Sequence, residues 1–380
     1  MKFPHYQVRP LRILLKGYYG YRNSGDDGLL NGVVYGLQKI FKTAKFTILS
    51  KEPVKIISGI KVNFVKSTKL WVAKEILKND CLVYGGGGIF QDNVDSEIKA
   101  LKRRLKLIRF AKFLRKKVFF VSISIGPLHT KEGMKLSKQI LQQANFISVR
   151  DLASYCWLQE NKITVLFLKI FDITILLKDF CNRGQSISCR GQTETLGISL
   201  MSLSVLGRIQ KFDEIMLNSL ANVVNELLEE NQTLQIKIFV FHDGDESVYG
   251  DRNICEQFYR LLEKKNRVIF VDYDPDVIHL LEEITSCHAF VGMRLHAGIY
   301  AYITGVPFIL VDYHPKCLGF AKEVDLPQMA IIQEKELINR WSIKDKITLI
   351  LNQPERMSPL KPVEMIYIQT LEQLSQVGKK

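Results

Sequence analysis

Short apolar runs alternate with segments of helical periodicity along the first half of the chain. Residues 11–16 form a run of strand length, and after a glycine-rich loop apolar residues recur at helical spacing from Leu29 to Ile40. Further strand-like runs follow at 45–49, 62–65, 81–84, 118–125, 146–149 and 163–166, with helical segments at 96–117 and 134–144. This alternation predicts a mostly parallel, doubly wound sheet.

A polar, glycine-containing stretch at 179–195 interrupts the pattern, which then resumes. Strand-like runs at 196–200, 236–241, 268–271, 289–291 and 308–311 are again separated by helical segments. A chain of 380 residues is long for one core, so two domains are expected. We assign 1–180 to an N-terminal α/β domain on the acceptor side, 181–195 to a linker, 196–350 to a C-terminal α/β domain, and 351–380 to a tail that packs back on the first domain.

The charge of the chain favours acidic partners. Its formal net charge is +14, while 47% hydrophobic and 24% charged residues are typical of a globular protein. Nucleic acid, an anionic membrane surface and phosphorylated substrates all fit this charge. A basic RNA-binding protein is the least favoured of these, because the sequence contains no nucleic-acid recognition motif, and we expect no nucleic-acid partner.

The seven cysteines are scattered and form no C-x-x-C pair, which argues against a zinc ribbon or a redox motif. Their odd number and the short apolar run near the N-terminus favour a reducing compartment, either the cytoplasm or an equivalent such as a plastid stroma. No cluster of carboxylates, histidines or cysteines has the spacing of a metal site. We therefore expect neither a metal nor a cofactor.

The helical segment at 96–117 carries ten positive residues, with Glu97 as its one acidic residue. Its apolar residues form one stripe. A basic amphipathic helix can lie against an anionic membrane, which would make the protein peripheral to a membrane. Packing on the sheet with a solvated basic face is the preferred interpretation, and lipid contact is the alternative.

Four cationic or titratable residues follow strand-like runs. Arg294 and His296 lie in the stretch 292–298, at a predicted junction between a strand and a helix, where backbone N–H groups attract anions. Arg150 follows the run 146–149, and Lys316 follows the run 308–311. Three cations around one histidine suit a small anion that bears carboxylate and phosphate, and histidine is the natural proton donor near neutral pH.

Two glycine-rich loops offer further ligand contacts. The loop at 17–27 contains Asn23 and Asp26, and four glycines at 85–88 follow the strand predicted at 81–84. Glycine permits the close approach of backbone to a ligand. The alternatives are that Asp26 or Asp27 only caps a helix and that the four glycines only form a tight turn.

These motifs together resemble the polysaccharide pyruvyl transferase family, close to the branch that acts on cell-wall polysaccharides. The matching segments occur in family order from residue 17 to residue 320 and cover most of the chain. They are Gly17-Tyr18-Tyr19-Gly20 with Asn23-Ser24-Gly25-Asp26, Gly85 to Asp92, Ser124-Ile125-Gly126-Pro127-Leu128, Ser148-Val149-Arg150-Asp151, Gly292 to Ala297, and Tyr313-His314-Pro315-Lys316 with Gly319-Phe320.

The resemblance implies a GT-B-like fold, with two Rossmann-like domains facing a cleft, and transfer of a pyruvyl group from phosphoenolpyruvate to a sugar or lipid-linked saccharide as a ketal. Phosphoenolpyruvate is then a substrate and no cofactor is needed. The resemblance implies the catalytic set His296, Arg294, Arg150 and Lys316. The implied substrate-binding residues are Asn23, Asp26, Gly85, Gly86, Gly87, Gly88, Asp92 and Leu295. The chain departs from the family at Asp172-Ile173-Thr174, where Asp-Pro-Ala is usual, and in the linker.

Two other functions share features with this interpretation. A glycosyltransferase or a sugar-nucleotide epimerase would use the same architecture and would need a site for base and ribose in the second domain. A basic protein that binds RNA or a membrane surface is the third alternative. The acceptor sugar and the oligomeric state do not follow from the sequence.

Overall fold

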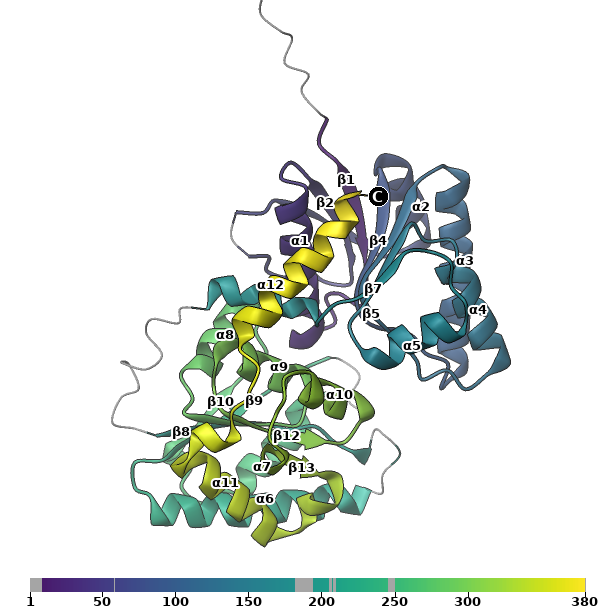
Figure 1. Ribbon diagram of the computed structural model, residues 1–380. Coiled ribbons are helices and arrows are strands. Elements are labelled where there is room, and N and C mark those ends of the chain that lie inside the picture. Colours follow the sequence, from purple (N-terminus) through teal and green to yellow (C-terminus); the bar gives the residue numbers. More distant parts are fainter. Residues whose placement is uncertain are drawn as a thin grey trace, which may run out of the picture. The chain divides into compact units, whose positions relative to one another are not determined.

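A computed structural model describes residues 9–57, 59–181, 194–204, 207, 210–244 and 250–379 (Figure 1). Residues 182–193, most of the predicted linker, lie outside the described residues. The contacts divide the chain into two compact units. The first comprises Met1–Gly20, Leu29–Ile173 and Gln369–Lys380, and the second comprises Tyr21–Gly28 and Thr174–Ile368. Residues 21–28, from near the N-terminus, therefore group with the second unit, and residues 369–380, from the C-terminus, group with the first.

The first unit is built on a seven-stranded parallel sheet in the order β3-β2-β1-β4-β5-β6-β7. Its strands are β1 (Arg12–Lys16), β2 (Lys45–Ser50), β3 (Val62–Lys66), β4 (Cys81–Phe90), β5 (Lys117–Ile125), β6 (Phe146–Val149) and β7 (Phe167–Lys169). Its helices are α1 (Ser24–Ile40), which begins in the second unit, α2 (Lys69–Lys78), α3 (Asp95–Phe113), α4 (Lys131–Leu141) and α5 (Leu152–Glu160).

The second unit repeats this plan with a six-stranded parallel sheet in the order β10-β9-β8-β11-β12-β13. Its strands are β8 (Thr195–Ser199), β9 (Gln235–Phe239), β10 (Val268–Val271), β11 (Ala289–Gly292), β12 (Phe308–Asp312) and β13 (Ile331–Gln333). Its helices are α6 (Gln210–Glu230), α7 (Arg252–Leu261), α8 (Val277–Thr285), α9 (Leu295–Thr304), α10 (Pro315–Glu323), α11 (Arg340–Asn352) and α12 (Val363–Leu374), whose last residues belong to the first unit.

Short 3₁₀ segments complete the described chain, at Ile173–Phe180, Lys265–Arg267, Gln328–Ala330, Glu334–Ile338, Pro354–Met357 and Ser375–Lys379. In each sheet the strand order reverses at one point, between β1 and β4 and between β8 and β11. Ligands of open α/β sheets bind at such points, beyond the carboxyl ends of the strands. The prediction of two doubly wound Rossmann-like domains is confirmed.

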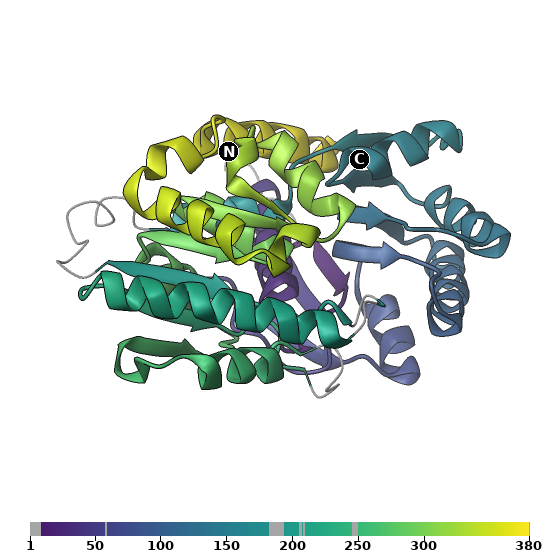
Figure 2. The same ribbon diagram turned by 90° about the horizontal axis from the view of Figure 1, so that it is seen from below.

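Apolar strands buried on both faces explain why helices cover both sides of each sheet. In the first unit, Leu14 of β1 packs in one cluster with Ile76 of α2 and Leu101 of α3. In the second unit, α9 lies on one face of the sheet and α6 and α11 lie on the other (Figure 1). Seen from below, the long helix α6 runs across its face of the sheet (Figure 2).

Strand β4 corrects one sequence prediction. The strand predicted at 81–84 does not end before the four glycines but continues through them to Phe90. Gly86 and Gly87 have φ angles of 68° and 82°, and the pairing with β5 shifts register after Gly88. The hydroxyl of Tyr19 donates a hydrogen bond to the Gly85 carbonyl at 2.5 Å. Close packing and a β-bulge thus account for glycines that the sequence pattern had assigned to a loop.

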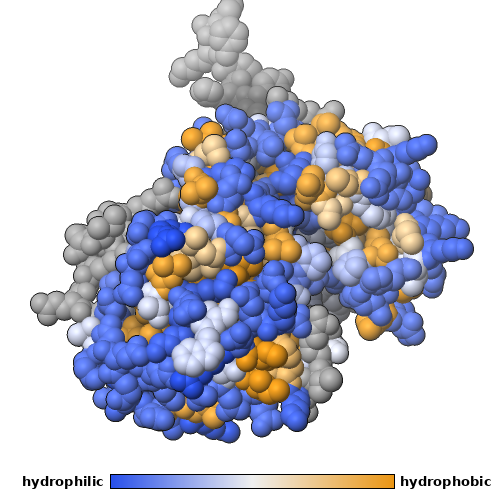
Figure 3. All heavy atoms as spheres, turned by 60° about the horizontal axis from the view of Figure 1, so that its bottom comes forward, coloured by the Kyte–Doolittle hydropathy of each residue, from blue (hydrophilic) through white to orange (hydrophobic). Residues whose placement is uncertain are grey.

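Polar residues cover most of the face that Figure 3 shows, and hydrophobic residues lie between them in small separate groups. Among the described residues, no helix is both long and apolar enough to span a bilayer. The six described cysteines, which exclude Cys189, are all free.

Arg150 is a buried residue at the carboxyl end of β6 in the first unit. Its Nη1 donates to the Asp172 carboxylate at 2.5 Å, and its Nε donates to the Ser124 hydroxyl at 2.9 Å. The two partners of the ion pair are 8% and 5% exposed at their side chains. The pair thereby joins the end of β6 to the segment after β7.

Replacing Arg150 by Ala should lower the free energy of unfolding by about 3–5 kcal/mol, because it removes the guanidinium that pairs with the buried Asp172 carboxylate. Urea denaturation measures the loss. Arg109→Ala removes an exposed arginine of α3 and should change the value by less than about 0.5 kcal/mol. Equal midpoints for the two variants would contradict a stabilising role for the pair.

Candidate functional site

The junction of β11 and α9 carries the arginine and the histidine that the sequence analysis singled out. β11 ends at Gly292 beside β8, at the point where the strand order of the second sheet reverses. Arg294 is the N-cap residue of α9 in an extended conformation, and the helix begins at Leu295. The first backbone N–H groups of a helix have no intrahelical partner, so Leu295 and His296 lie where an anion is favoured.

Asp251 holds Arg294 in place. The Arg294 Nε lies 3.1 and 3.0 Å from the two carboxylate oxygens of Asp251, and Nη2 lies 2.5 Å from Oδ1. Asp251 is fully buried. Burial by itself lowers the pKa of the Arg294 guanidinium, but Asp251 outweighs it and holds that pKa above its usual value. The arginine is therefore permanently charged and fixed in orientation.

Asp251 also forms two hydrogen bonds with the backbone of His242. Its amide donates to the His242 carbonyl at 2.6 Å, and its Oδ2 accepts from the His242 amide at 3.0 Å. The same carboxylate thus orders the segment after β9 and orients Arg294 at the start of α9. Sequence analysis missed Asp251, because nothing in its neighbourhood marks it as a partner of a residue 43 positions later.

The segment Tyr21–Gly28, from near the N-terminus, belongs to this second unit. Asn23 forms an antiparallel bridge with His242, and the Ser24 amide donates to the Phe241 carbonyl at 2.9 Å. Asn23 also caps α1, since its Oδ1 accepts from the Gly25 amide at 3.0 Å. The cap that the sequence analysis considered for Asp26 or Asp27 is therefore supplied by Asn23.

Two glycines of this segment lie against α9. A Cβ added to Gly25 would lie 2.3 Å from Nδ1 of His296, and one added to Gly28 would overlap the hydroxyl of Tyr300. The Tyr300 hydroxyl donates to the Ser24 carbonyl at 2.6 Å. The first turn of α1 thus packs directly on the His296 ring, which is half-buried. Asp26 follows Gly25 in the chain, and its contact with substrate stays a prediction.

Lys316, which follows the strand-like run 308–311, lies in the first turn of α10, one residue after Pro315. Its amide donates to Nδ1 of His314 at 3.2 Å. Burial, together with the charge of Lys316, lowers the pKa of His314. Burial also raises the pKa of Tyr313, although Arg294 acts in the opposite direction. The starts of α9 and α10 therefore carry two cationic side chains, Arg294 and Lys316, and the uncharged phenol of Tyr313.

A second cluster of charges flanks the segment 21–28. Arg22 donates to the Asp243 carboxylate at 2.6 Å, and Arg252 donates to the same carboxylate at 2.8 Å. Burial would raise the pKa of Asp243, but these two arginines lower it below its usual value. The cluster fixes the loop after β9 to the N-terminal segment, and it was not predicted from the sequence.

The remaining predicted site residues lie in the first unit: Arg150, Asp92 and the glycines of β4. Asp92 is buried, and its carboxylate accepts from the amides of His129 and Thr130 at 2.6 and 2.7 Å and from the Thr130 hydroxyl at 2.6 Å. Burial raises its pKa, and these hydrogen bonds outweigh burial, so the pKa is lowered. Asp92 therefore orders the turn before α4, and its contact with substrate stays a prediction.

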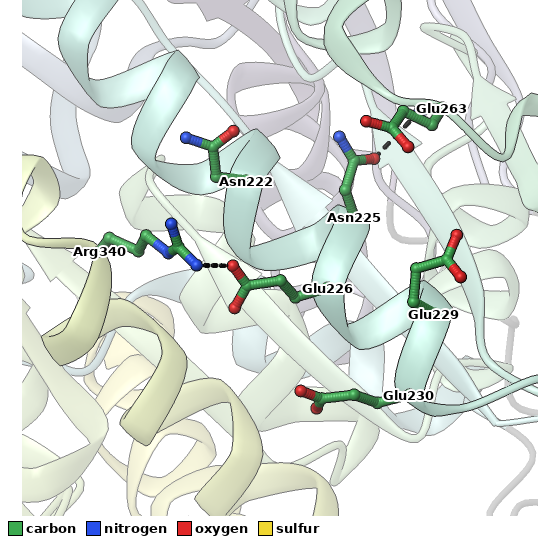
Figure 4. Close-up of a pocket in the computed structure, with 7 residues that line it drawn as sticks. All are labelled: Asn222, Asn225, Glu226, Glu229, Glu230, Glu263 and Arg340. Atoms are coloured by element: carbon green, nitrogen blue, oxygen red, sulfur yellow. Dashed lines mark hydrogen bonds and ion pairs between the residues drawn. The ribbon is translucent and has the colours of Figure 1, made fainter.

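An acidic pocket of about 380 Å³ lies on the outer side of α6 (Figure 4). Its carboxylates are largely neutralised: Glu226 pairs with Arg340 and Lys344, Glu230 pairs with Lys344, and Glu229 pairs with Lys264. The described residues contain no group of three metal-binding side chains. We assign no function to this pocket.

The two parallel sheets, with an arginine and a histidine at the strand-order reversal of the second, define a two-domain protein of the GT-B fold class. The chain belongs to the polysaccharide pyruvyl transferase family, whose family model matches residues 23–315. It is also 22% identical over 262 residues to the amylovoran biosynthesis protein AmsJ of Erwinia amylovora. That match covers 64% of this chain and 60% of AmsJ.

Solved structures show the same fold at low sequence identity. The UDP-GlcNAc 2-epimerase of Neisseria meningitidis, solved with UDP-GlcNAc, has a TM-score of 0.63 at 11% identity, over 97% of this chain and 100% of that one. HepE of Anabaena, solved with UDP-glucose, has a TM-score of 0.52 at 13% identity, over 96% and 100% of the two chains. These likenesses establish the fold class alone.

The substitution Gly25→Ala should displace the His296 ring, because the added methyl group would lie 2.3 Å from Nδ1. We expect a loss of about 1–3 kcal/mol in unfolding free energy from overpacking, and altered NMR signals of the His296 imidazole. Gly319→Ala in α10 is the control, since the methyl group that it adds would have no atom within 4 Å. Unchanged imidazole signals in Gly25→Ala would refute the contact.

Asp251→Asn should keep the shape of the Arg294 partner but remove its charge. The variant should unfold at lower urea, by about 3–5 kcal/mol, because a buried ion pair has lost one charge. Asp272→Asn serves as control, since Asp272 pairs with Arg252 at the surface and is 62% exposed. If Asp251→Asn is as stable as this control, Arg294 does not depend on the carboxylate.

Proposed function

We propose that this protein transfers the pyruvyl group of phosphoenolpyruvate to two hydroxyls of a sugar in a cell-wall polysaccharide or exopolysaccharide precursor. The products are a pyruvyl ketal and inorganic phosphate. Membership in the polysaccharide pyruvyl transferase family supports this reaction. The partial match to a protein of amylovoran biosynthesis is consistent with an exopolysaccharide acceptor.

His296 is the proposed acid. As an imidazolium it donates a proton to the methylene carbon of phosphoenolpyruvate, which becomes the methyl group of the product. C2 is then electrophilic, and a sugar hydroxyl adds to it as its O–H bond breaks. Next the C2–O bond to phosphate breaks and the phosphate leaves with the bonding electron pair. The second sugar hydroxyl then adds to C2 and loses its proton, which closes the ketal.

Cations hold the donor in this scheme. Arg294 offers a charged guanidinium fixed by Asp251, and the amides at the start of α9 add partial positive charge. Lys316, at the start of α10, is a second proposed phosphate ligand. Arg150 is implied in donor binding by the family resemblance alone. Fixed charges of this kind stabilise negative charge as it develops on the leaving phosphate.

Asp26 is the proposed acceptor of a sugar proton. Its carboxylate is carried by the first turn of α1, one residue from the glycine that packs on His296. In this scheme the acid, His296, is on α9, and the base, Asp26, is on the first turn of α1. The packing of Gly25 against His296, beside the Arg294–Asp251 pair, is the observation that carries the proposal, because it joins family motifs that lie far apart in the chain.

His296→Ala should reduce pyruvyl transfer by about 10²–10⁴-fold, the usual contribution of a general acid. The assay measures phosphate release from phosphoenolpyruvate in the presence of nitrophenyl or lipid-linked sugars. His279→Ala is the matched control, because His279 is an exposed histidine of α8 that pairs with Asp274. Transfer by His296→Ala at the wild-type rate would rule out the acid role.

The same preparation distinguishes the rival functions. Calorimetry with phosphoenolpyruvate should show binding that Arg294→Ala weakens. Binding of a UDP-sugar, with none of phosphoenolpyruvate, would instead favour a glycosyltransferase or an epimerase.

A further inference from the structure

A cavity of about 780 Å³ in the first unit is not part of the site described above. It lies at the carboxyl end of β1, between α2 and α3. The described residues that line it are Lys16, Gly17, Ser67, Val72, Ala100, Arg103, Arg104, Lys106, Leu107 and Phe110. The cavity is therefore lined both by apolar side chains, such as Val72, Leu107 and Phe110, and by cationic ones.

The charges of this cavity lack compensation. Four of its described lining residues are cationic and none is acidic. Within the described part of the chain, no ion pair joins any of the four to a carboxylate; Lys16 instead donates to the Ser67 hydroxyl at 3.1 Å. Burial lowers the pKa of Lys16 to about 8, and the charges of Arg104 and Arg103 add to this effect. Like charges gathered in this way favour a bound anion.

Arg104 is the innermost of these cations. Its Nη1 donates to the Ile89 carbonyl at 2.6 Å, and its guanidinium lies over the rings of Tyr84 and Phe90, at 5.5 and 5.2 Å. Its Nε is buried and has no hydrogen-bond partner among the described residues. A buried donor without a partner is costly, and an anion in the cavity would supply one.

The position of the cavity in the fold is that of a ligand site. Lys16 is the last residue of β1, which lies between β2 and β4 where the strand order reverses. Lys16 follows Leu14 by two residues, so both point to the face that α2 and α3 cover. Ligands of such sheets bind beyond the strand ends at this point.

Large apolar side chains outside the cavity lining are exposed on the same two helices. Phe113 at the end of α3 is 82% exposed, and Trp71 and Leu77 of α2 are 44% and 55% exposed. Lys116 donates to the Leu77 carbonyl at 3.1 Å and so ties the end of α3 to the end of α2. Exposed aromatic residues beside basic ones are typical of surfaces that lie in a membrane interface.

We propose that the cavity at Lys16, Arg103 and Arg104 holds the phosphate headgroup of an anionic membrane lipid, while Phe113, Trp71 and Leu77 enter the interface. α3 carries seven basic residues against two acidic ones, and this excess of positive charge would add to the attraction of an anionic membrane. A soluble phosphate ester would use the cavity but would leave the exposed apolar side chains of α2 and α3 without a role, so these side chains favour the lipid. The proposal is independent of pyruvyl transfer.

Flotation of the full chain with vesicles tests this assignment. The protein should float with vesicles of phosphatidylglycerol and phosphatidylcholine but not with phosphatidylcholine alone. The double variant Arg103→Ala/Lys106→Ala should bind about 25-fold more weakly, at about fivefold for each charge. Phe113→Ser should weaken binding without changing the charge. Urea denaturation verifies that each variant is folded.

A matched control removes two positive charges from α4, another helix of the first unit. Lys131 and Lys135 are exposed on α4, outside the cavity, and Lys131→Ala/Lys135→Ala should retain most of the wild-type affinity. An equal loss in both double variants would overturn the proposal, because net charge alone would then explain binding. Calorimetry with glycerol phosphate and pyrophosphate distinguishes the source: tight binding of either, with no flotation, would also overturn it.

Discussion

The ion pair between Arg294 and Asp251 is the contact on which the site of the second unit depends. Asp251 is fully buried, and a buried carboxylate is stable only beside a cation that fills its hydrogen-bonding capacity. The same carboxylate accepts from the His242 amide. This one carboxylate therefore orders the backbone after β9 and fixes the guanidinium at the start of α9. The His242 backbone that it holds is also the one that forms the antiparallel bridge with Asn23.

That N-terminal segment belongs to the second unit, although the residues before and after it in the sequence belong to the first. Residues 21–28 lie between two parts of the first unit in sequence, yet they pack on α9 and on the segment after β9. Gly25 and Gly28 are required there because any side chain would overlap His296 or Tyr300. The glycine-rich loop thus serves protein packing, and it brings Gly25 against the histidine.

The cations of this chain fall into two classes with different chemistry. Arg150 and Arg294 are paired with buried carboxylates, which hold each guanidinium in one orientation. The cations that line the cavity at the end of β1 have no carboxylate partner within the described chain, so no acidic side chain there compensates their charge. The net charge of +14 therefore does not spread evenly, and α3 carries much of the uncompensated part.

Apolar periodicity alone was sufficient to predict two parallel, doubly wound sheets, because each strand and helix is specified by residues close in sequence. Motif order likewise identified Arg294 and His296 at a helix start. Only tertiary structure decided that β4 continues through four glycines, that Asn23 caps α1, and that Asp251 holds Arg294. Each of these depends on residues distant in the chain, such as Tyr19 packing on Gly85, and a local pattern carries no record of such partners.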